Sequence, residues 1–338
     1  MCMNKTAKSI LLSNSFEKLA SVYSAEVLEK LESTAELDTT FRNKAMILAD
    51  KASVADTEYI FSTWGMPVFD EAEIAACFPK LKAVFYAAGS VQEFARPFLN
   101  AHIKVFSAWA ANAVPVAEYT AAQIVLGMKG FFAASRLCKH SYKEAKACFT
   151  AYPGVYDETV GIIGAGMIGK MVIEKLKDLH LNVLVFDPFL PDEKAKELGV
   201  VKCALPELFE KSFVISNHLA NNAQTKGMLD YRLFDRMRPN AVFLNTGRGA
   251  QVVEDDLVRV LTERPDITAV LDVTYPEPPV NGHPFYTLEN CVLTPHIAGS
   301  SGNEVHRMAE YMAKEFEKHE NGQSSPYEVT LKMLETMS

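Results

Sequence analysis

Short runs of consecutive apolar residues alternate with amphipathic segments along the whole chain. Continuous apolar runs of this kind are typical of strands in a parallel sheet that is covered on both faces. The predicted strands are residues 9–12, 59–62, 83–87 and 104–107 in the first third, and residues 160–163, 183–186, 213–216, 241–245, 267–272 and 292–294 further along. Because helical patterns lie between them, the sequence predicts an α/β fold with doubly wound parallel sheets.

The length of 338 residues predicts two domains. Helical patterns at residues 24–32 and 70–77 belong to the first. Residues 111–115, Ala-Asn-Ala-Val-Pro, interrupt the pattern ahead of a long helical segment at 116–129, and we place the crossover between the domains there. The last helical segment, residues 301–319, is expected to pack back on the first domain. The predicted domains are residues 1–112 plus 301–338 and residues 113–300, with a linker-like stretch at 321–326.

Composition and charge argue against several classes of protein. Apolar residues make up 49% and charged residues 22% of the chain, which is ordinary for a globular protein. The net charge of −8 and the scattered lysines and arginines argue against a nucleic-acid partner. No run approaches the ~20 apolar residues of a membrane span, and the apolar stretch after Lys5 and Lys8 is too short for a signal peptide. We therefore expect a cytoplasmic protein that binds neither nucleic acid nor membrane.

The cysteines give no sign of a metal centre. The six are Cys2, Cys77, Cys138, Cys148, Cys203 and Cys291. None stands in a CxxC or similar ligand spacing, and no cysteine–histidine cluster suggests zinc. A chain of this size does not need disulfides for stability, so we expect free thiols in a reducing compartment and no metal.

A glycine-rich motif follows the predicted strand at residues 160–163 and opens an amphipathic helix. The motif is Gly164-Ala165-Gly166-Met167-Ile168-Gly169. Gly164 permits a tight turn, Gly166 lets the backbone approach a pyrophosphate, and Gly169 lets the helix lie close to the strand. The N-terminus of the helix then offers free N–H groups to the phosphates. This arrangement predicts a dinucleotide site.

Asp187 stands eighteen residues after Gly169, at the end of the next predicted strand. A carboxylate at that position accepts hydrogen bonds from the hydroxyls of the adenosine ribose and repels a 2′-phosphate. Pro188 and Phe189 follow it, whereas an NADP site has an arginine nearby. The predicted cofactor is therefore NAD rather than NADP.

Three ionisable residues come shortly after predicted strands in the second half of the chain: Arg248, Glu277 and His296. In open parallel sheets, ligands bind at the carboxyl ends of the strands. A loop arginine or glutamate is usually a solvated charge, and a lone histidine is usually structural. Beside a dinucleotide site, however, a cation can hold a carboxylate, and a histidine can exchange a proton with a carbonyl or hydroxyl group. Together the three predict hydride-transfer chemistry.

Five motifs, in order and spacing, resemble those of the D-isomer-specific 2-hydroxyacid dehydrogenases over nearly the whole chain. The motifs are Val116-Ala117-Glu118, the glycine turn with Asp187, Asn245-Thr246-Gly247-Arg248-Gly249, Leu271-Asp272-Val273 with Glu277-Pro278, and Thr294-Pro295-His296. The resemblance implies a Rossmann NAD-binding domain inserted into a flavodoxin-like substrate domain. It also implies an NAD-dependent oxidoreductase that interconverts a 2-oxo acid and its D-2-hydroxy acid.

The resemblance implies a role for each residue of the predicted site. Arg248 anchors the substrate carboxylate and polarises the keto group, and His296 is the general acid and base. Glu277 hydrogen-bonds the histidine and favours its protonated form. The residues implied to lie at the nicotinamide end of the cofactor are Thr246, Gly247, Arg248, Asp272, His296 and Ala298, and those of a further cofactor loop are His218 and Leu219. Ala220 replaces the proline that is usual in this loop.

Two more implied features lie outside these loops. The backbone N–H groups expected to meet the substrate carboxylate are those of Ala88, Gly89 and Ser90. The family is commonly dimeric, and the resemblance implies a homodimer through the region between Val116 and Tyr156.

Glu277 also discriminates among members of the family. Formate dehydrogenases carry glutamine at this position, because oxidising formate releases no alcohol proton. Glutamate therefore favours 2-oxo acid chemistry. NAD(H)-sensing corepressors keep the same three residues, so a peptide-binding protein of that class stays open as an alternative.

The substrate is predicted to be small and unphosphorylated. The loop at residues 62–67 offers hydroxyl groups and the Trp64 indole, but no lysine or arginine to neutralise a phosphate dianion. Asn112 is one neutral amide, which is little for two charges. We expect glyoxylate, hydroxypyruvate or pyruvate as the oxidised substrate, with 3-phosphoglycerate dehydrogenase as the open alternative.

Overall fold

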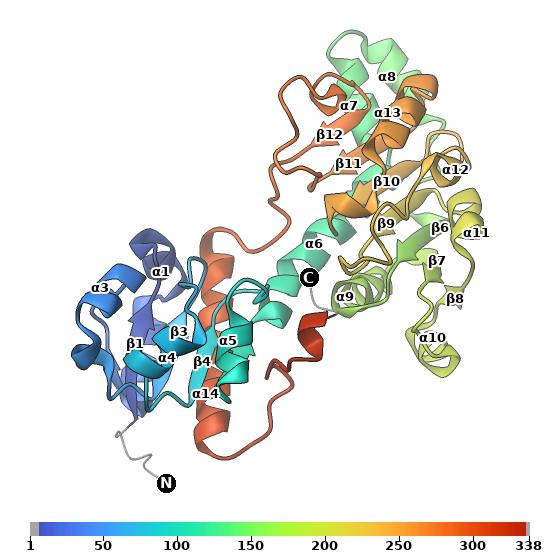
Figure 1. The fold of residues 1–338 in the computed structure, drawn as a ribbon. Coiled ribbons are helices and arrows are strands. Elements are labelled where there is room, and N and C mark those ends of the chain that lie inside the picture. The colour runs from blue at the N-terminus through green and yellow to red at the C-terminus, as the bar shows by residue number, and fades with distance from the viewer. Residues whose placement is uncertain (1–6, 336–338) are drawn as a thin grey trace. The chain divides into compact units, whose positions relative to one another are not determined.

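The computed structural model of the chain describes residues 7–335. The chain divides into two compact units: unit 1 comprises residues 1–112 and 300–338, and unit 2 comprises residues 113–299. Each unit contains a parallel sheet with helices on its faces, so the predicted α/β class is confirmed (Figure 1). Ser300, predicted in the inserted domain, groups with unit 1.

Unit 1 contains a five-stranded parallel sheet in the order β2-β1-β3-β4-β5. The strands are β1 (Lys8–Leu12), β2 (Glu36–Asp38), β3 (Tyr59–Ser62), β4 (Ala83–Tyr86) and β5 (Lys104–Ser107). The four strands predicted here correspond to β1, β3, β4 and β5, whose residues are almost all buried. The apolar pattern does not predict edge strand β2, because its residues are exposed or half-buried.

Helices cover the sheet of unit 1, and side-chain caps fix where several of them begin. The helices are α1 (Phe16–Val22), α2 (Ala25–Thr34), α3 (Lys44–Ala49), α4 (Glu71–Cys77), α5 (Ala95–Asn100) and α14 (His306–Glu320), with 3-10 turns η1 (Lys51–Val54), η4 (Gly302–Val305) and η5 (Met333–Glu335). Ser24 caps α2 by accepting from the Val27 N–H, and Asp70 forms a capping box with Glu73 at the start of α4. These caps explain the starts of the two helices predicted in this region.

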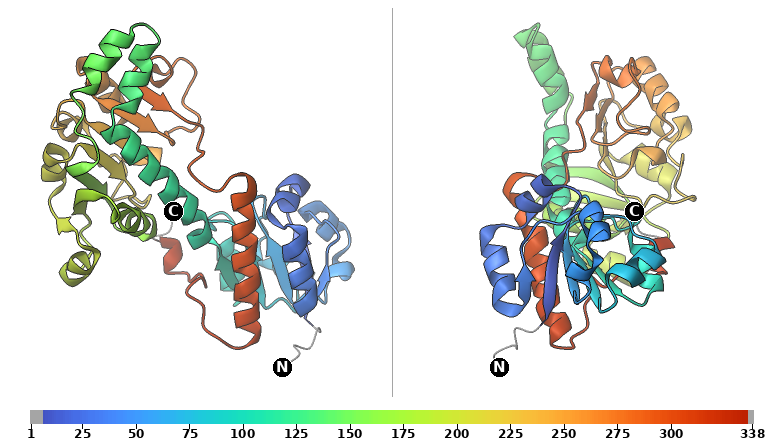
Figure 2. Two further views of the ribbon diagram at one scale, coloured as in Figure 1. Left: turned by 180° about the vertical axis from the view of Figure 1, so that it is seen from behind. Right: turned by 60° about the vertical axis from the view of Figure 1, so that its left-hand side comes forward.

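The C-terminal part of the chain packs against the sheet of unit 1. Helix α14 lies along one face of it (Figure 2). The helix contributes to the core the side chains of Met308, Ala309, Met312, Ala313 and Phe316. Beyond the stretch predicted to be a linker, the Val329 N–H donates to the Val105 C=O at 2.7 Å. The Ser107 N–H donates to the Tyr327 C=O at 3.1 Å, so this segment covers the edge of β5.

Unit 2 contains a seven-stranded parallel sheet in the order β12-β11-β10-β9-β6-β7-β8. The strands are β6 (Tyr156–Ile163), β7 (His180–Phe186), β8 (Val201–Lys202), β9 (Val214–Asn217), β10 (Val242–Asn245), β11 (Thr268–Leu271) and β12 (Cys291–Leu293). All six strands predicted here are present, and β8 is a two-residue edge strand with exposed side chains. The strand order reverses between β6 and β9, which is the arrangement of a Rossmann fold.

Helices flank this second sheet. They are α6 (Trp109–Met128), α7 (Phe131–Cys138), α8 (Tyr142–Phe149), α9 (Met167–Leu176), α10 (Asp192–Leu198), α11 (Leu205–Lys211), α12 (Tyr231–Phe234) and α13 (Glu254–Glu263), with 3-10 turns η2 (Gly249–Gln251) and η3 (Pro284–Tyr286). The interruption predicted at residues 111–115 is wrong: α6 begins at Trp109 and continues through Pro115. The proline removes one main-chain hydrogen bond. Ala111 and Ala117 on either side are completely buried, and packing of this kind favours the helix.

The cysteines that the structure describes form no disulfide. Cys77, Cys138, Cys148, Cys203 and Cys291 are free thiols, whereas Cys2 and Lys5 lie outside the described residues. Among residues 7–335, no group of three or more histidine, cysteine or acidic side chains could hold a metal ion. Nor do these residues form a helix whose length and hydrophobicity would allow it to span a bilayer.

Candidate active site

The predicted site residues of unit 2 lie mainly in loops that follow neighbouring strands. Strands β9, β10, β11 and β12 are adjacent and parallel, so the loops after them emerge at one edge of the sheet. These loops carry His218 and Leu219 after β9, Thr246, Gly247 and Arg248 after β10, Asp272 and Glu277 after β11, and His296 and Ala298 after β12. The sheet therefore brings the predicted chemistry to one edge.

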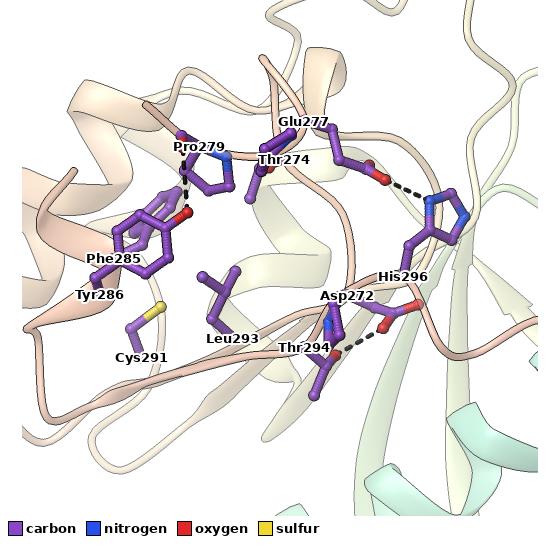
Figure 3. Close-up of a pocket in the computed structure, with 12 residues that line it drawn as sticks. Asp272, Thr274, Glu277, Pro279, Phe285, Tyr286, Cys291, Leu293, Thr294 and His296 are labelled. Atoms are coloured by element: carbon purple, nitrogen blue, oxygen red, sulfur yellow. Dashed lines mark hydrogen bonds and ion pairs between the residues drawn. The ribbon is translucent and has the colours of Figure 1, made fainter. Parts of the chain in front are cut away.

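His296 and Glu277 form a hydrogen-bonded pair (Figure 3). The histidine Nδ1 lies 2.7 Å from Glu277 Oε1, and the two side chains are 46% and 43% exposed. Because a carboxylate only accepts hydrogen bonds, Nδ1 carries a proton and Nε2 is the ring nitrogen left for a ligand. Nε2 points away from the apolar residues drawn beyond Glu277 in Figure 3.

Asp272 shapes the turn that presents His296. The histidine has φ +55°, a left-handed conformation that residues other than glycine seldom adopt. The buried Asp272 carboxylate accepts from the Ile297 N–H at 2.8 Å and from the Ala298 N–H at 2.9 Å. It also accepts from the Thr294 hydroxyl at 2.6 Å. Asp272 therefore holds the turn that carries His296, a role that its implied place near the nicotinamide does not reveal.

Arg248 is a half-buried cation in the loop after β10. Its Nη1 donates to the Gly247 C=O at 2.8 Å, and no carboxylate of residues 7–335 lies within salt-bridge distance of it. Burial lowers the pKa of the guanidinium, and the nearby charge of Glu277 raises it, but arginine stays protonated in proteins. A Cβ at Gly249 would lie 2.0 Å from the Thr274 carbonyl carbon, so glycine lets this turn pack against the loop leading to Glu277. Such a guanidinium suits a ligand carboxylate.

The glycine motif forms the tight turn between β6 and α9. Gly164 has φ +90°, and a Cβ there would lie 2.9 Å from the His218 carbonyl oxygen. A Cβ at Gly169 would lie 2.0 Å from the Gly164 carbonyl oxygen, so the helix touches the turn. A Cβ at Gly166 would meet nothing within 4 Å, and no side chain caps α9 there. The first residues of the helix are Met167 and Ile168. The open helix N-terminus fits the phosphates of a dinucleotide.

Asp187 ties the glycine turn to the end of β7. Its Oδ2 accepts from the Ala165 N–H at 2.7 Å, and its Oδ1 accepts from the Phe189 N–H at 2.8 Å. Each carboxylate oxygen can accept a further hydrogen bond, so ribose hydroxyls can be bound without breaking these contacts. The structure thus adds a role in turn geometry to the role expected in cofactor binding.

Replacing Asp187 with alanine is expected to weaken NADH binding more than NADPH binding. Both cofactors lose the turn geometry held through Ala165, but only NADH also loses a carboxylate that binds its ribose diol, and NADPH is relieved of charge repulsion. Fluorescence titration of both cofactors measures the ratio of their affinities. An equal loss for both would mean that Asp187 only holds the turn.

The loop after β9, which is predicted to contact the cofactor, carries a buried histidine. The His218 N–H donates to the Ile163 C=O at 2.7 Å, and its Nε2 lies 2.9 Å from Ser216 Oγ. Its Nδ1 is shielded from solvent and has no partner among the described residues. Burial lowers the pKa of His218 to about 4, so the ring is neutral near pH 7.

The loop expected to meet the substrate carboxylate lies in unit 1. The Ala88 N–H already donates to the Tyr86 C=O at 2.9 Å, so it is not free for a ligand as expected. The Gly89 and Ser90 N–H groups have no acceptor among residues 7–335. Ser107 Oγ, at the end of β5, donates to the Gly89 C=O at 2.6 Å and so holds this loop in place. Two of the three expected donors are therefore available.

A cavity of about 680 Å³ adjoins the His296–Glu277 pair on the side away from Nε2 (Figure 3). Its lining includes Thr274, Pro279, Phe285, Tyr286, Cys291 and Leu293. Burial raises the pKa of the Cys291 thiol to about 12, so this cysteine is not a nucleophile at neutral pH. The sequence gives no signal for this cavity, because much of its lining comes from an irregular loop without apolar periodicity.

The chain is similar in sequence to known proteins. The family model described as D-isomer specific 2-hydroxyacid dehydrogenase, NAD binding domain, matches residues 123–298. The chain is 32% identical over 201 residues to a D-3-phosphoglycerate dehydrogenase of Archaeoglobus fulgidus, covering 59% of this chain and 37% of that protein. It is 35% identical over 172 residues to a glyoxylate reductase of Korarchaeum cryptofilum, covering 51% and 52%. The matches thus span about half or less of these relatives.

Solved structures agree on the fold over almost the entire chain. The NAD-complexed D-isomer specific 2-hydroxyacid dehydrogenase of Lactobacillus delbrueckii ssp. bulgaricus superposes with a TM-score of 0.79 at 17% identity, covering 96% of this chain and 100% of that one. At this identity the likeness shows the fold alone. The family model covers more than half of the chain, and the chain therefore belongs to the D-isomer-specific 2-hydroxyacid dehydrogenase family and carries its NAD-binding domain.

Proposed function

We propose that this protein is an NAD-dependent dehydrogenase that interconverts a small unphosphorylated 2-oxo acid and its D-2-hydroxy acid. The observation that carries the proposal is the pairing of His296 Nδ1 with Glu277 Oε1 at 2.7 Å. The same sheet edge carries Arg248, which has no anionic partner among residues 7–335. A proton donor and a free cation at one edge match the keto and carboxylate groups of a 2-oxo acid.

In the direction of reduction, His296 arrives protonated on both ring nitrogens. Its Nε2–H donates a proton to the keto oxygen as a hydride reaches the keto carbon, so the carbonyl becomes an alcohol. Glu277 stabilises the imidazolium through Nδ1–H and fixes the orientation of the ring. Arg248 binds the carboxylate and orients the keto group. In the oxidative direction, neutral His296 takes the alcohol proton.

The chain's own residues fit NAD(H). The open N-terminus of α9 at Gly166 suits the pyrophosphate, and Asp187 retains acceptor capacity for the ribose. When bound, this cofactor accepts or supplies the hydride.

An unphosphorylated substrate is favoured by the charges around the loop at residues 62–67. Lys44 lies next to this loop, where it donates to the Val68 C=O at 2.6 Å. It is already paired with Glu73 at 2.7 Å, so it does not offer a free cation to a phosphate. A phosphorylated acid is the second candidate, because the relatives include a D-3-phosphoglycerate dehydrogenase as well as a glyoxylate reductase.

The test is NADH oxidation with glyoxylate, hydroxypyruvate, pyruvate and 3-phosphohydroxypyruvate as substrates. We expect the highest kcat/KM with one of the three unphosphorylated acids. A clear preference for the phosphorylated acid would establish the second candidate instead. Very weak turnover of all four, together with NADH-dependent peptide binding, would identify a corepressor-like protein.

Replacing Glu277 with glutamine is expected to lower kcat/KM for 2-oxo acid reduction while leaving NADH affinity unchanged. Glutamine still accepts from Nδ1–H and keeps the ring oriented, but it carries no charge to stabilise the imidazolium. The pair is half-exposed, and an exposed ion pair is worth about 0.2–1 kcal/mol, so the expected loss is about fivefold or less. The measurements are steady-state reduction kinetics and NADH fluorescence titration.

The control for this change is Glu254→Gln. Glu254 Oε1 accepts from the Tyr275 N–H at 2.7 Å and supports the same loop without contacting His296. Its kcat/KM should match that of the wild type. A Glu277→Gln enzyme with wild-type kcat/KM would remove Glu277 from the proton transfer.

We also propose a homodimer that associates through residues 116–156. Large apolar side chains are exposed in this region, which supports association. They are Phe131, Tyr142, Phe149 and Tyr156. Sedimentation of the purified protein tests the dimer. A cytoplasmic location stays a prediction from the sequence.

A further inference from the structure

Three buried amide side chains connect the cofactor loop after β9 with the turn that carries Arg248. They are Asn217, Asn245 and Gln251, each 0% exposed. Asn217 Nδ2 donates to Gln251 Oε1 at 2.5 Å and to Asn245 Oδ1 at 3.0 Å, so the three form one network. Burying an amide costs free energy unless its groups are hydrogen-bonded, and these bonds favour a single arrangement of the two loops.

The network holds the main chain of Leu219 and Arg248 at both their N–H and C=O groups. The Leu219 N–H donates to Asn217 Oδ1 at 3.2 Å, and its C=O accepts from Gln251 Nε2 at 2.7 Å. The Arg248 N–H donates to Gln251 Oε1 at 3.2 Å, and its C=O accepts from Asn245 Nδ2 at 3.2 Å. Gln251 therefore bonds directly to both loops with one side chain.

The same loop also lies against the glycine turn. A Cβ at Gly164 would lie 2.9 Å from the His218 carbonyl oxygen and 3.1 Å from Leu219 N. A continuous chain of contacts thus runs from the turn that fits the pyrophosphate, through Leu219 and Gln251, to Arg248. In this chain of contacts, Gln251 bonds only to other residues of the protein.

We infer that Gln251 is a positioning residue that couples the cofactor loop to Arg248. The inference rests on the proposed function, in which Arg248 binds the substrate carboxylate. Gln251 fixes the main chain of Arg248 relative to residues 217–219, so the carboxylate affinity depends on a side chain that touches no substrate. Because Gln251 also donates to the Leu219 C=O, its loss loosens the loop that is expected to meet the cofactor.

The test is Gln251→Met, which keeps the length of the side chain and removes its amide. The Leu219 C=O and the Arg248 N–H then lose their partners. We expect the KM for the preferred 2-oxo acid to rise about tenfold, equivalent to about 1.4 kcal/mol, while kcat changes less than about threefold. NADH affinity, measured by fluorescence titration, should fall about threefold or more, equivalent to about 0.7 kcal/mol.

The matched control is Asn290→Leu in the same unit. Asn290 is also a buried amide, and its Nδ2 donates at 2.9 Å to the Leu261 and Ile267 C=O groups near the start of β11, far along the strands from the site edge. This variant should lower the Tm and leave both KM and NADH affinity unchanged. Thermal unfolding of both variants separates lost stability from lost positioning.

A Gln251→Met protein with a lowered Tm but wild-type KM and NADH affinity would overturn the inference. If that variant fails to fold, Gln251→Glu decides the question, because it keeps an acceptor for the Arg248 N–H and replaces the donor to the Leu219 C=O with a carboxylate oxygen, which only accepts hydrogen bonds. It should weaken NADH binding more than it raises KM, and unchanged NADH affinity would overturn the inference. A wild type that reduces no 2-oxo acid would refute the proposed function, and the NADH titrations would still decide the role of Gln251.

Discussion

His296→Ala is expected to abolish most turnover of the 2-oxo acid while leaving NADH affinity nearly unchanged. The histidine supplies the proton as the keto oxygen becomes an alcohol, so its contribution is made in the transition state rather than in binding. Loss of a positioned general acid costs on the order of 10²–10⁴ in rate. Steady-state reduction kinetics and NADH fluorescence titration measure the two quantities.

The control is His180→Ala, which removes an exposed histidine at the start of β7. Its turnover should match that of the wild type. Near-normal turnover by His296→Ala would refute the assignment of the general acid. A large loss of NADH affinity would instead place the histidine in cofactor binding, for example through the turn that Asp272 holds.

Arg248→Met is expected to lower kcat/KM for the 2-oxo acid by about 10²–10³. The half-buried guanidinium has no anionic partner among the described residues, so its charge is available to the substrate carboxylate. Removing one member of a hydrogen-bonded charge pair costs about 2–5 kcal/mol, and each 1.4 kcal/mol is tenfold. Arg248→Lys should recover only part of the activity, because lysine keeps the charge without the planar fork of donors.

Kinetics across a panel of carboxylates separates anchoring from a general loss of structure. Arg259→Met is the matched control, since Arg259 is 61% exposed and paired with Glu263 on the surface of α13. This variant should retain wild-type kcat/KM. An Arg248→Met enzyme with unchanged KM for every carboxylate would remove the arginine from substrate binding.

Much of the fold follows from local sequence patterns. The continuous apolar runs predict ten of the strands, because a strand buried on both faces needs apolar residues at successive positions. The strands that the pattern misses are β2 and β8, which are short edge strands with exposed side chains. An edge strand is defined by pairing with its neighbour, and local hydrophobicity does not encode that pairing.

Helix α6 shows why a local signal can mislead. Proline in a helix interior is unfavourable on average, so the sequence Ala-Asn-Ala-Val-Pro predicts an interruption. In the structure the helix continues through Pro115, and Ala111 and Ala117 on either side are completely buried, so packing favours the helix there. Likewise, the segment after the predicted linker pairs with β5, because the edge of that strand offers main-chain partners that the tail's own composition does not reveal.

The family, the glycine turn and the candidate residues Arg248, Glu277 and His296 can be predicted from the amino-acid sequence, since each depends on residue type at a fixed distance from a strand. How those residues are held is visible only in the folded chain. The carboxylate of Asp272, the amide of Gln251 and the open space at Gly166 acquire their roles from groups distant in sequence. Hydrogen bonds and close contacts depend on distance in space, which the chain specifies only after its strands have paired into a sheet.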